Sequence, residues 1–187
     1  IMTRKAFENA VVVASAVGGS SNCTTHLSAI AKHMGIKFDL SDWQKLGHNI
    51  PLLVNCQPAG EYLMESFYRA GGVPAVMKEL IKNKKIHTNI MTVTGKTVGK
   101  NLKRKIDVDT KVIKTFKNSL EENAGFLVMK SNFFSSAIMK TSVISKEFRA
   151  RYLSDPKNPN VFNGKAAVFE GPEAVSYTHL RAHETRI

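Results

Sequence analysis

The sequence has little cysteine and no long hydrophobic run. Among its 187 residues only Cys23 and Cys56 occur, which is too few for a disulfide framework and leaves no CxxC spacing of the kind that binds metal. The longest apolar stretches, such as Ala10–Val17, are far shorter than the ~20 residues that a membrane span needs. The first eight residues also lack the basic-then-apolar order of a secretory signal. We therefore expect a globular cytoplasmic protein without a membrane partner.

Acidic residues are scarce as well. The chain has 15 Asp and Glu against 27 Lys and Arg, a formal net charge of +12. Such an excess raises nucleic acid as a partner, because clustered cations release counterions from phosphates. The lysines between Lys78 and Lys117, however, are scattered among Asn, Ile and Thr, without the interleaved aromatic residues of a stacking platform. We expect a solvated basic face and no nucleic-acid partner, and a small basic RNA-binding protein remains the distant alternative.

Apolar spacing predicts a helical first part of the chain. Apolar residues between Phe7 and Val17 fit one helix face, although the run Val11–Val13 is also compatible with a buried strand. A polar loop at Gly18–Asn22 interrupts the pattern, and a second helix follows as far as Gly35. Further helices are predicted by capping residues and apolar spacing at 41–46, 62–69 and 74–81.

The character of the sequence changes in its second part. Residues 84–118 are basic and weakly patterned, so we expect an exposed connection with one short helix after Gly95. From Gly125 onward, short apolar and β-branched runs predict strands at 126–129, 136–143 and 166–169. The fold class expected is mixed α/β.

Several blocks, in order along the chain, resemble a known enzyme family. They are KAFENA at residues 5–10, GGSSN at 18–22, RAGGVPAVMKEL at 69–80, TVTGKT at 92–97, and segments within 138–154 and 168–173. Together they are similar to the family that includes dihydroxy-acid dehydratase, the sugar-acid dehydratases and phosphogluconate dehydratase. One motif alone carries little weight, whereas collinear matches over about residues 4–174 make coincidence a poor explanation.

This resemblance implies a division of the chain. Residues 1–120 correspond to the helical end of the family's α/β first domain with a basic linker, and residues 121–174 to the first strands of its β-rich second domain. Residues 175–187 depart from the family and resemble the conceptual translation of a sequencing adapter, so they are expected to be non-native. His179 and His183 are therefore not interpreted as a metal site, although they stand four residues apart.

The resemblance also implies an activity. Members are hydro-lyases, typically homo-oligomers, that convert a 2,3-dihydroxy acid to a 2-keto acid, as in branched-chain amino-acid biosynthesis. The alternative substrate is a pentonate or hexonate sugar acid. The family uses an iron–sulfur cluster, Mg²⁺ and a serine base, whose residues belong to family segments before Ile1 and after Pro172. We therefore expect no catalytic residue and no metal ligand in this chain, including Cys23 and Cys56, and no activity of this fragment alone.

The best local candidate for substrate binding is the set Gly19, Ser20, Ser21 and Asn22. Glycine lets the backbone approach a ligand, the polar side chains supply donors, and the following helix directs its amides and positive dipole end at an anion such as a substrate carboxylate. Ordinary helix capping by the same residues is the alternative.

Three neighbouring features receive structural interpretations. His26 is expected to be a hydrogen-bonded core residue rather than a ligand or proton carrier. Gly71–Pro74 is interpreted as a helix stop and restart. The sequence Gly95-Lys96-Thr97 is not interpreted as a nucleotide loop, because that motif requires glycine where Ile90 stands.

Overall fold

A computed structural model describes residues 1–158, 161–165, 168–174 and 176. Within it the chain divides into two compact units, Ile1–Ile144 and Ser145–Ile187, which are described separately below. The tail expected to be non-native, 175–187, lies outside the described residues except for Ser176.

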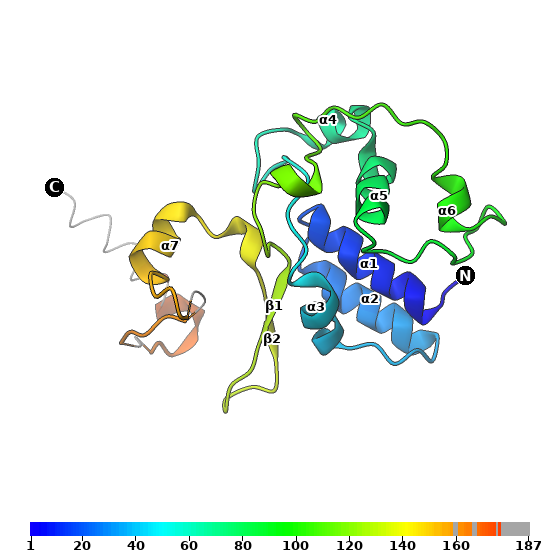
Figure 1. Ribbon diagram of the computed structural model, residues 1–187. Coiled ribbons are helices and arrows are strands. Elements are labelled where there is room, and N and C mark those ends of the chain that lie inside the picture. The colour runs from blue at the N-terminus through cyan, green and yellow to red at the C-terminus, as the bar shows by residue number, and fades with distance from the viewer. Residues whose placement is uncertain (159–160, 166–167, 175, 177–187) are drawn as a thin grey trace. The chain divides into compact units, whose positions relative to one another are not determined.

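Three helices that pack against one another form one part of the first unit: α1 (Arg4–Ala16), α2 (Asn22–His33) and α3 (Leu40–Gly47) (Figure 1). Thr3 caps α1 by accepting from the backbone N–H of Ala6, and Asp39 opens α3 in a capping box with Asp42. The buried side of α1 includes Phe7 and Val11. The helices predicted at 7–17, at 22–35 and after Ser41 are confirmed.

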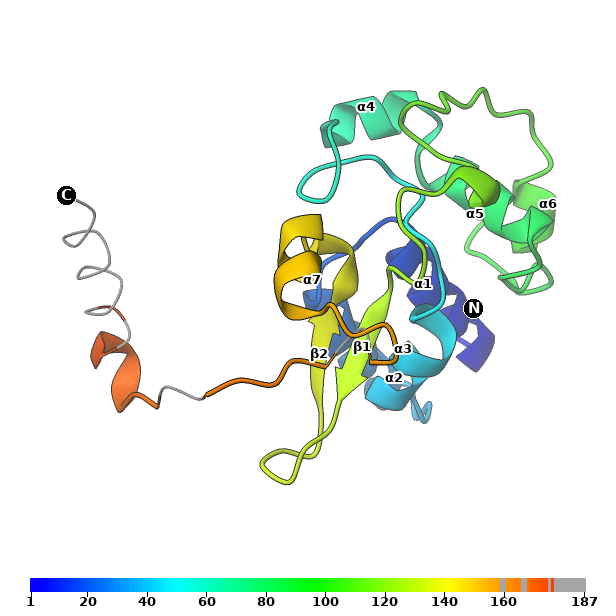
Figure 2. The same ribbon diagram turned by 60° about the vertical axis from the view of Figure 1, so that its left-hand side comes forward.

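A second helical layer follows in the chain. It comprises α4 (Met64–Arg69), α5 (Gly72–Lys82) and the single turn α6 (Val98–Asn101), and α5 packs on both α1 and α4 (Figure 2). Gly71 and Gly72 have positive φ values of 109° and 57°, which an L side chain adopts only with strain. The predicted stop and restart of the helix at Gly71–Pro74 is thereby confirmed.

Residues 84–118 are only partly the exposed connection that the sequence indicates. Ile86, Val112 and Ile113 are buried in the same apolar cluster as Leu53 and Val54. Isolated antiparallel bridges join Val54 to Ile113 and Leu52 to Glu121, and the segment ends in a 3₁₀ turn, η1 (Phe116–Asn118). The expectation of exposure is wrong for these apolar residues, because they satisfy the backbone of the buried 52–56 segment and cover its side chains.

A β-hairpin completes the first unit. Strands β1 (Phe126–Met129) and β2 (Ala137–Lys140) pair antiparallel with Phe126 opposite Lys140, and the 3₁₀ turn η2 (Thr141–Val143) follows. Strand β1 packs on α3, where the Phe126 ring meets Trp43 edge to face with centroids 5.0 Å apart. Helices together with this hairpin confirm the mixed α/β class. Residues 121–144 pack with the helices of this unit, whereas the division of the family's domains at residue 120 stays a prediction.

The second unit begins with a helix that the sequence pattern did not reveal. Ser145 caps α7 (Lys146–Tyr152), and Tyr152 packs against the rings of Phe148 and Phe162 at centroid distances of 4.8 and 5.5 Å. The strand predicted at 166–169 falls partly outside the described residues. Its last two residues, Val168 and Phe169, are exposed and are not part of a strand.

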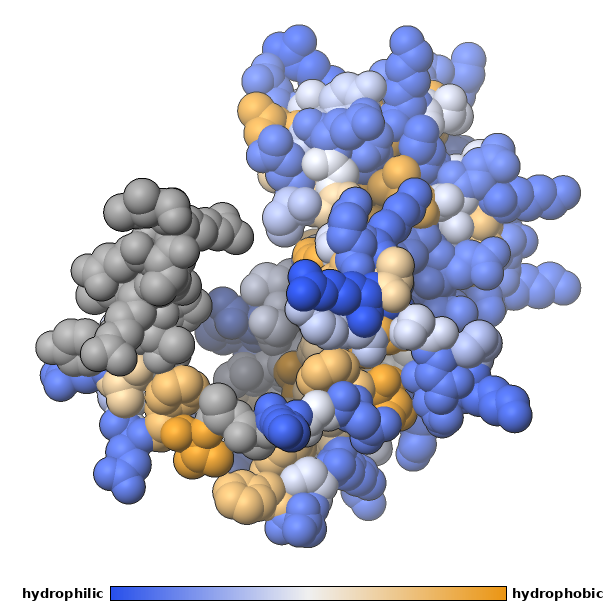
Figure 3. Space-filling model, turned by 90° about the vertical axis from the view of Figure 1, so that its left-hand side faces the viewer, coloured by the Kyte–Doolittle hydropathy of each residue, from blue (hydrophilic) through white to orange (hydrophobic). Residues whose placement is uncertain are grey.

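The described part of the chain contains no helix long and apolar enough to cross a membrane. Hydrophilic side chains predominate on the face drawn in Figure 3, and hydrophobic residues lie among them in small groups.

Candidate functional site

The loop predicted to bind substrate joins α1 to α2, and its glycines end α1. Gly18 has a positive φ of 65°, its N–H donates to Ser15 O, and the N–H of Gly19 donates to Ala14 O at 2.8 Å. This is the Schellman pattern, which satisfies the last carbonyls of a helix. The conformation of both glycines is therefore explained by helix termination.

The polar residues of the loop divide into two kinds. The Ser20 hydroxyl accepts from the backbone N–H of Asn22 at 3.2 Å and so takes a local role. Ser21 occupies the N-cap position of α2, yet its side chain makes no capping hydrogen bond. Ser21 and Asn22 are exposed, and within the described residues their side chains make no hydrogen bond to protein. A local turn hydrogen bond therefore accounts for Ser20, and the side chains of Ser21 and Asn22 remain free to contact a ligand.

Two residues distant in sequence meet this loop, and sequence reasoning did not assign them. The Lys140 ammonium, at the end of β2, donates to Gly18 O at 2.5 Å. The Ser142 hydroxyl is buried and, among the described residues, has no hydrogen-bond partner. Lys140 Nζ and Ser142 Oγ both lie 3.9 Å from the point where a Cβ would stand on Gly18. The available signal was their position within the family-like block at 138–145.

Lys140 is only partly exposed, and its burial affects the pKa of its ammonium. Burial lowers the pKa of its ammonium, and an electrostatic interaction with Cys23 acts in the opposite direction. Within the described residues no carboxylate forms an ion pair with Lys140. Beside the loop thus lies a partly desolvated cation that has no carboxylate counterion among the residues described.

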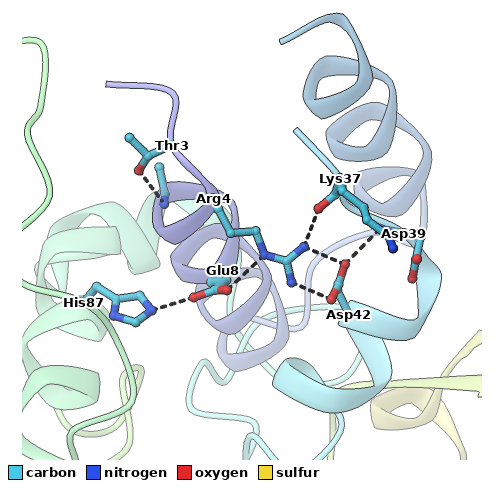
Figure 4. Close-up of polar contacts among 8 residues, drawn as sticks. Thr3, Arg4, Glu8, Lys37, Asp39, Asp42 and His87 are labelled. Atoms are coloured by element: carbon cyan, nitrogen blue, oxygen red, sulfur yellow. Dashed lines mark hydrogen bonds and ion pairs between the residues drawn. The ribbon is translucent and has the colours of Figure 1, made fainter. Parts of the chain in front are cut away.

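A second polar network joins α1 to α3 and to the segment after α5 (Figure 4). The Arg4 guanidinium donates to both carboxylate oxygens of Asp42, at 2.5 and 2.9 Å, to Lys37 O at 2.6 Å, and to Glu8 at 3.0 Å. Glu8 in turn lies 2.6 Å from His87 Nε2. All its charged groups are paired, which indicates that this network holds elements together.

The carboxyl groups of that network titrate below their usual range. Burial alone acts to raise the pKa of Asp42, but hydrogen bonds from Arg4 and from the backbone N–H of Asp39 outweigh it and lower that pKa. Burial likewise opposes the hydrogen bonds from Arg4 and His87 at Glu8, whose pKa is also lowered. Both side chains are therefore ionised at neutral pH.

The surroundings of Cys56 do not favour an iron–sulfur cluster. Cys56 is buried, burial raises the pKa of its thiol, and its Sγ lies 3.6 Å from Leu63 O. A cluster ligand requires the thiolate, which such a site disfavours. Among the described residues no group of three or more His, Cys, Asp or Glu side chains could hold a metal ion. The surroundings of Cys56 thus oppose a role as cluster ligand, and the expectation that Cys23 is no metal ligand stays a prediction.

The expectation for His26 is wrong. It is exposed on α2, whereas Thr24 and Ala31 are the buried residues of that helix. The inward face of α2 passes through Thr24, Leu27 and Ala31, which places His26 beside it and toward solvent. His26 is therefore no core residue.

A cleft lies elsewhere, between α3 and the hairpin. It has a volume of about 650 Å³, and its lining includes Ser41, Lys45, Lys130 and Ser136. None of Gly19, Ser20, Ser21 and Asn22 lines it. The predicted loop is a surface feature beside Lys140 and not part of this cleft.

Comparison with known proteins gives the class to which this arrangement belongs. Residues 1–101, more than half of the chain, match the family described as "Dihydroxy-acid/6-phosphogluconate dehydratase N-terminal". The chain therefore belongs to this dehydratase family, as its motifs predict.

Individual relatives refine this result. A D-xylonate dehydratase of Caulobacter vibrioides is 49% identical over 173 residues, which are 92% of this chain and 29% of the relative. A dihydroxy-acid dehydratase of Cytophaga hutchinsonii is 37% identical over 188 residues, 100% of this chain and 31% of the relative. Another, of Flavobacterium psychrophilum, is 52% identical over 102 residues, 54% of this chain and 18% of the relative. The chain thus spans less than a third of each of these relatives.

Proposed function

We propose that this chain is part of a hydro-lyase that removes water from a 2,3-dihydroxy acid, with a sugar acid such as a pentonate as its substrate. The observation that carries this proposal is the 49% identity to a D-xylonate dehydratase over 92% of the chain. The Cytophaga dihydroxy-acid dehydratase reaches 37% over a comparable length. Similarity over the whole chain therefore favours the sugar acid.

A branched-chain dihydroxy acid is the second candidate. It is supported by the Flavobacterium dihydroxy-acid dehydratase, which is 52% identical to this chain over 102 residues. Both candidates share the chemistry of the reaction. Hydroxide is a poor leaving group and a proton next to a carboxylate is weakly acidic, so a Lewis acid and a positioned base must act together.

The chain's own contribution in this proposal is to bind and orient the acid. Ser21 and Asn22 supply free polar side chains at the start of α2, and Gly19 and Ser20 hold the loop in shape. The iron–sulfur cluster and Mg²⁺ that the resemblance implies need ligands other than Cys23 and Cys56. We also propose a cytoplasmic homo-oligomer, and the two unpaired cysteines support a reducing compartment.

Exchange of segments tests this function. In two hybrid enzymes, residues 1–173 of this chain replace the aligned segment of the Caulobacter D-xylonate dehydratase or of the Cytophaga dihydroxy-acid dehydratase. The formation of 2-keto acid is then measured with each host's own substrate. We expect the D-xylonate hybrid to retain kcat/KM within about tenfold of its host, and the other hybrid to lose more. The reverse order would favour the branched-chain substrate, and inactivity of both hybrids with host metal content intact would contradict the proposal.

A further inference from the structure

The charge of Lys140 is partly withdrawn from water. Its ammonium is drawn toward Gly18 O, is partly buried, and has no carboxylate partner among the residues described. A cation withdrawn from water without a counterion is unfavourable, and a bound anion relieves that cost. Because an ammonium has three N–H donors and one is used on Gly18, two remain for such an anion.

The hairpin fixes where this charge lies. Lys140 is the last residue of β2 and pairs with Phe126, whose ring is buried against Trp43. The following residue, Thr141, is buried and donates through its hydroxyl to Gly125 O at 2.6 Å. Lys140 is thus presented to the loop by a packed strand and not by a freely moving surface segment.

The unpaired hydroxyl of Ser142 is a second observation that indicates a ligand. Only 6% of this residue is exposed, and its hydroxyl is without a hydrogen-bond partner in the described structure. It lies at the same side of Gly18 as the ammonium. An anion held by the two remaining N–H donors of the ammonium is an acceptor for this hydroxyl. Binding of an anion therefore satisfies a group that is otherwise left unpaired.

The anion fits the chemistry of the family. D-xylonate and dihydroxy acids differ in chain length and branching and share one carboxylate. Every candidate substrate can therefore be bound through its carboxylate. Lys140 supplies a cation for this contact, and Ser21 and Asn22 supply exposed donors beside it.

We propose that Lys140 binds the carboxylate of the acid substrate at the Gly18–Asn22 loop. The inference rests on the proposed function and adds a binding residue from the end of the hairpin to the loop between α1 and α2. Lys140 contacts the substrate in this proposal and takes no part in proton transfer.

Kinetics of the active hybrid test it. Lys140→Met is compared with Lys140→Arg, which keeps the charge, and with Lys130→Met, which removes an exposed lysine of the same hairpin. We expect Lys140→Met to raise KM at least about tenfold with kcat changed less than about threefold, and the other two variants to stay within about threefold of the parent KM. An unchanged KM in Lys140→Met would overturn the inference, whatever happens to its melting temperature.

Binding to the 187-residue chain separates this inference from the proposed function. D-xylonate, with neutral D-xylose as the control that lacks a carboxylate, is titrated while the backbone amide signals of Gly19–Asn22 are followed by NMR. We expect D-xylonate alone to shift these signals, and Lys140→Met to abolish the shift. If the hybrid enzymes were inactive but D-xylonate alone still shifted these signals, the proposed function would fail and the binding role of Lys140 would stand. Equal shifts by D-xylose, or shifts retained in Lys140→Met, would overturn the role of Lys140.

Discussion

At the residue scale, Trp43 is the central side chain of the apolar cluster that joins α3 to β1. It is fully buried between the rings of Phe38 and Phe126, at centroid distances of 6.4 and 5.0 Å. Its indole N–H has no partner among the described residues. Trp43 therefore contributes through shape and apolar area, and its polar atom opposes that contribution.

Replacement of this side chain gives the first stability prediction. We expect Trp43→Ala to lower the free energy of unfolding by about 3–5 kcal/mol, because it leaves a cavity against Phe126. Trp43→Phe, the matched control, is expected to cost about 1–2 kcal/mol, since it retains a ring and removes the unpaired N–H. Urea unfolding followed by circular dichroism measures both. Equal losses in the two variants would show that ring packing is not the cause.

The ion pair of Arg4 with Asp42 gives a prediction about pH. Because the pKa of Asp42 is lower in the folded chain than in the unfolded one, its contribution is present above the unfolded pKa of about 3.9 and is lost as the pH falls through the folded pKa. Asp42→Asn should therefore lower the free energy of unfolding at pH 7 by about 1–2 kcal/mol, and its difference from the parent should vanish in acid.

An exposed pair supplies the control for that series. Glu65 and Arg69 form an ion pair on α4 whose side chains are both mostly exposed. Glu65→Gln is expected to change the free energy of unfolding by less than about 0.5 kcal/mol at pH 7. Urea titrations between pH 3 and pH 7 compare the two variants. A pH-independent effect of Asp42→Asn would contradict the assignment of its charge.

At the element scale, α3 and β1 approach so closely that one position admits only glycine. A Cβ on Gly125 would overlap the carbonyl group of Gly47, the last residue of α3. Backbone on both sides of this contact leaves no flexible side chain to move aside. The position of the hairpin on α3 therefore depends on the absence of a side chain at Gly125.

Substitution of glycine tests this approach. We expect Gly125→Ala to lower the free energy of unfolding by at least about 3 kcal/mol, because the hairpin must move away from α3. Gly35→Ala is the matched control: Gly35 has a positive φ of 66° but nothing near its Cβ position, so only about 1 kcal/mol of backbone strain is expected. Thermal unfolding of both variants provides the comparison. A loss in Gly125→Ala no larger than that in Gly35→Ala would exclude the steric explanation.

At the scale of the whole molecule, apolar residues are exposed together on one short helix. Leu63, Met64 and Tyr68, at the start of α4 and on it, are 63%, 66% and 82% exposed. Adjacent exposed apolar side chains favour association, whereas single ones are common on protein surfaces. The face formed by these three residues is therefore where we expect copies of the chain to meet.

Sedimentation at increasing concentration tests this expectation. The average mass of the 187-residue chain should rise with concentration, and the double substitution Leu63→Ser with Tyr68→Ser should reduce that rise. Val93→Ser, at an exposed apolar residue outside α4, should leave it unchanged. A chain that stays monomeric at every concentration would contradict the role of this face.

The sequence by itself determined the elements whose causes are local. Apolar spacing and capping residues located α1, α2 and α5 and the strands β1 and β2, and the collinear motifs identified the family. These patterns involve residues that are close together in sequence, so they can be recognised without the tertiary structure.

Only the tertiary structure decided which distant residues meet. It buried Ile86, Val112 and Ile113 of a segment that is basic overall, turned His26 toward solvent, and brought Lys140 to Gly18 across 122 residues of sequence. Composition averages over a segment, whereas burial depends on the backbone that each side chain faces. The loop at Gly18–Asn22 could thus be found from its motif, but its charged partner required the position of the hairpin against the helices.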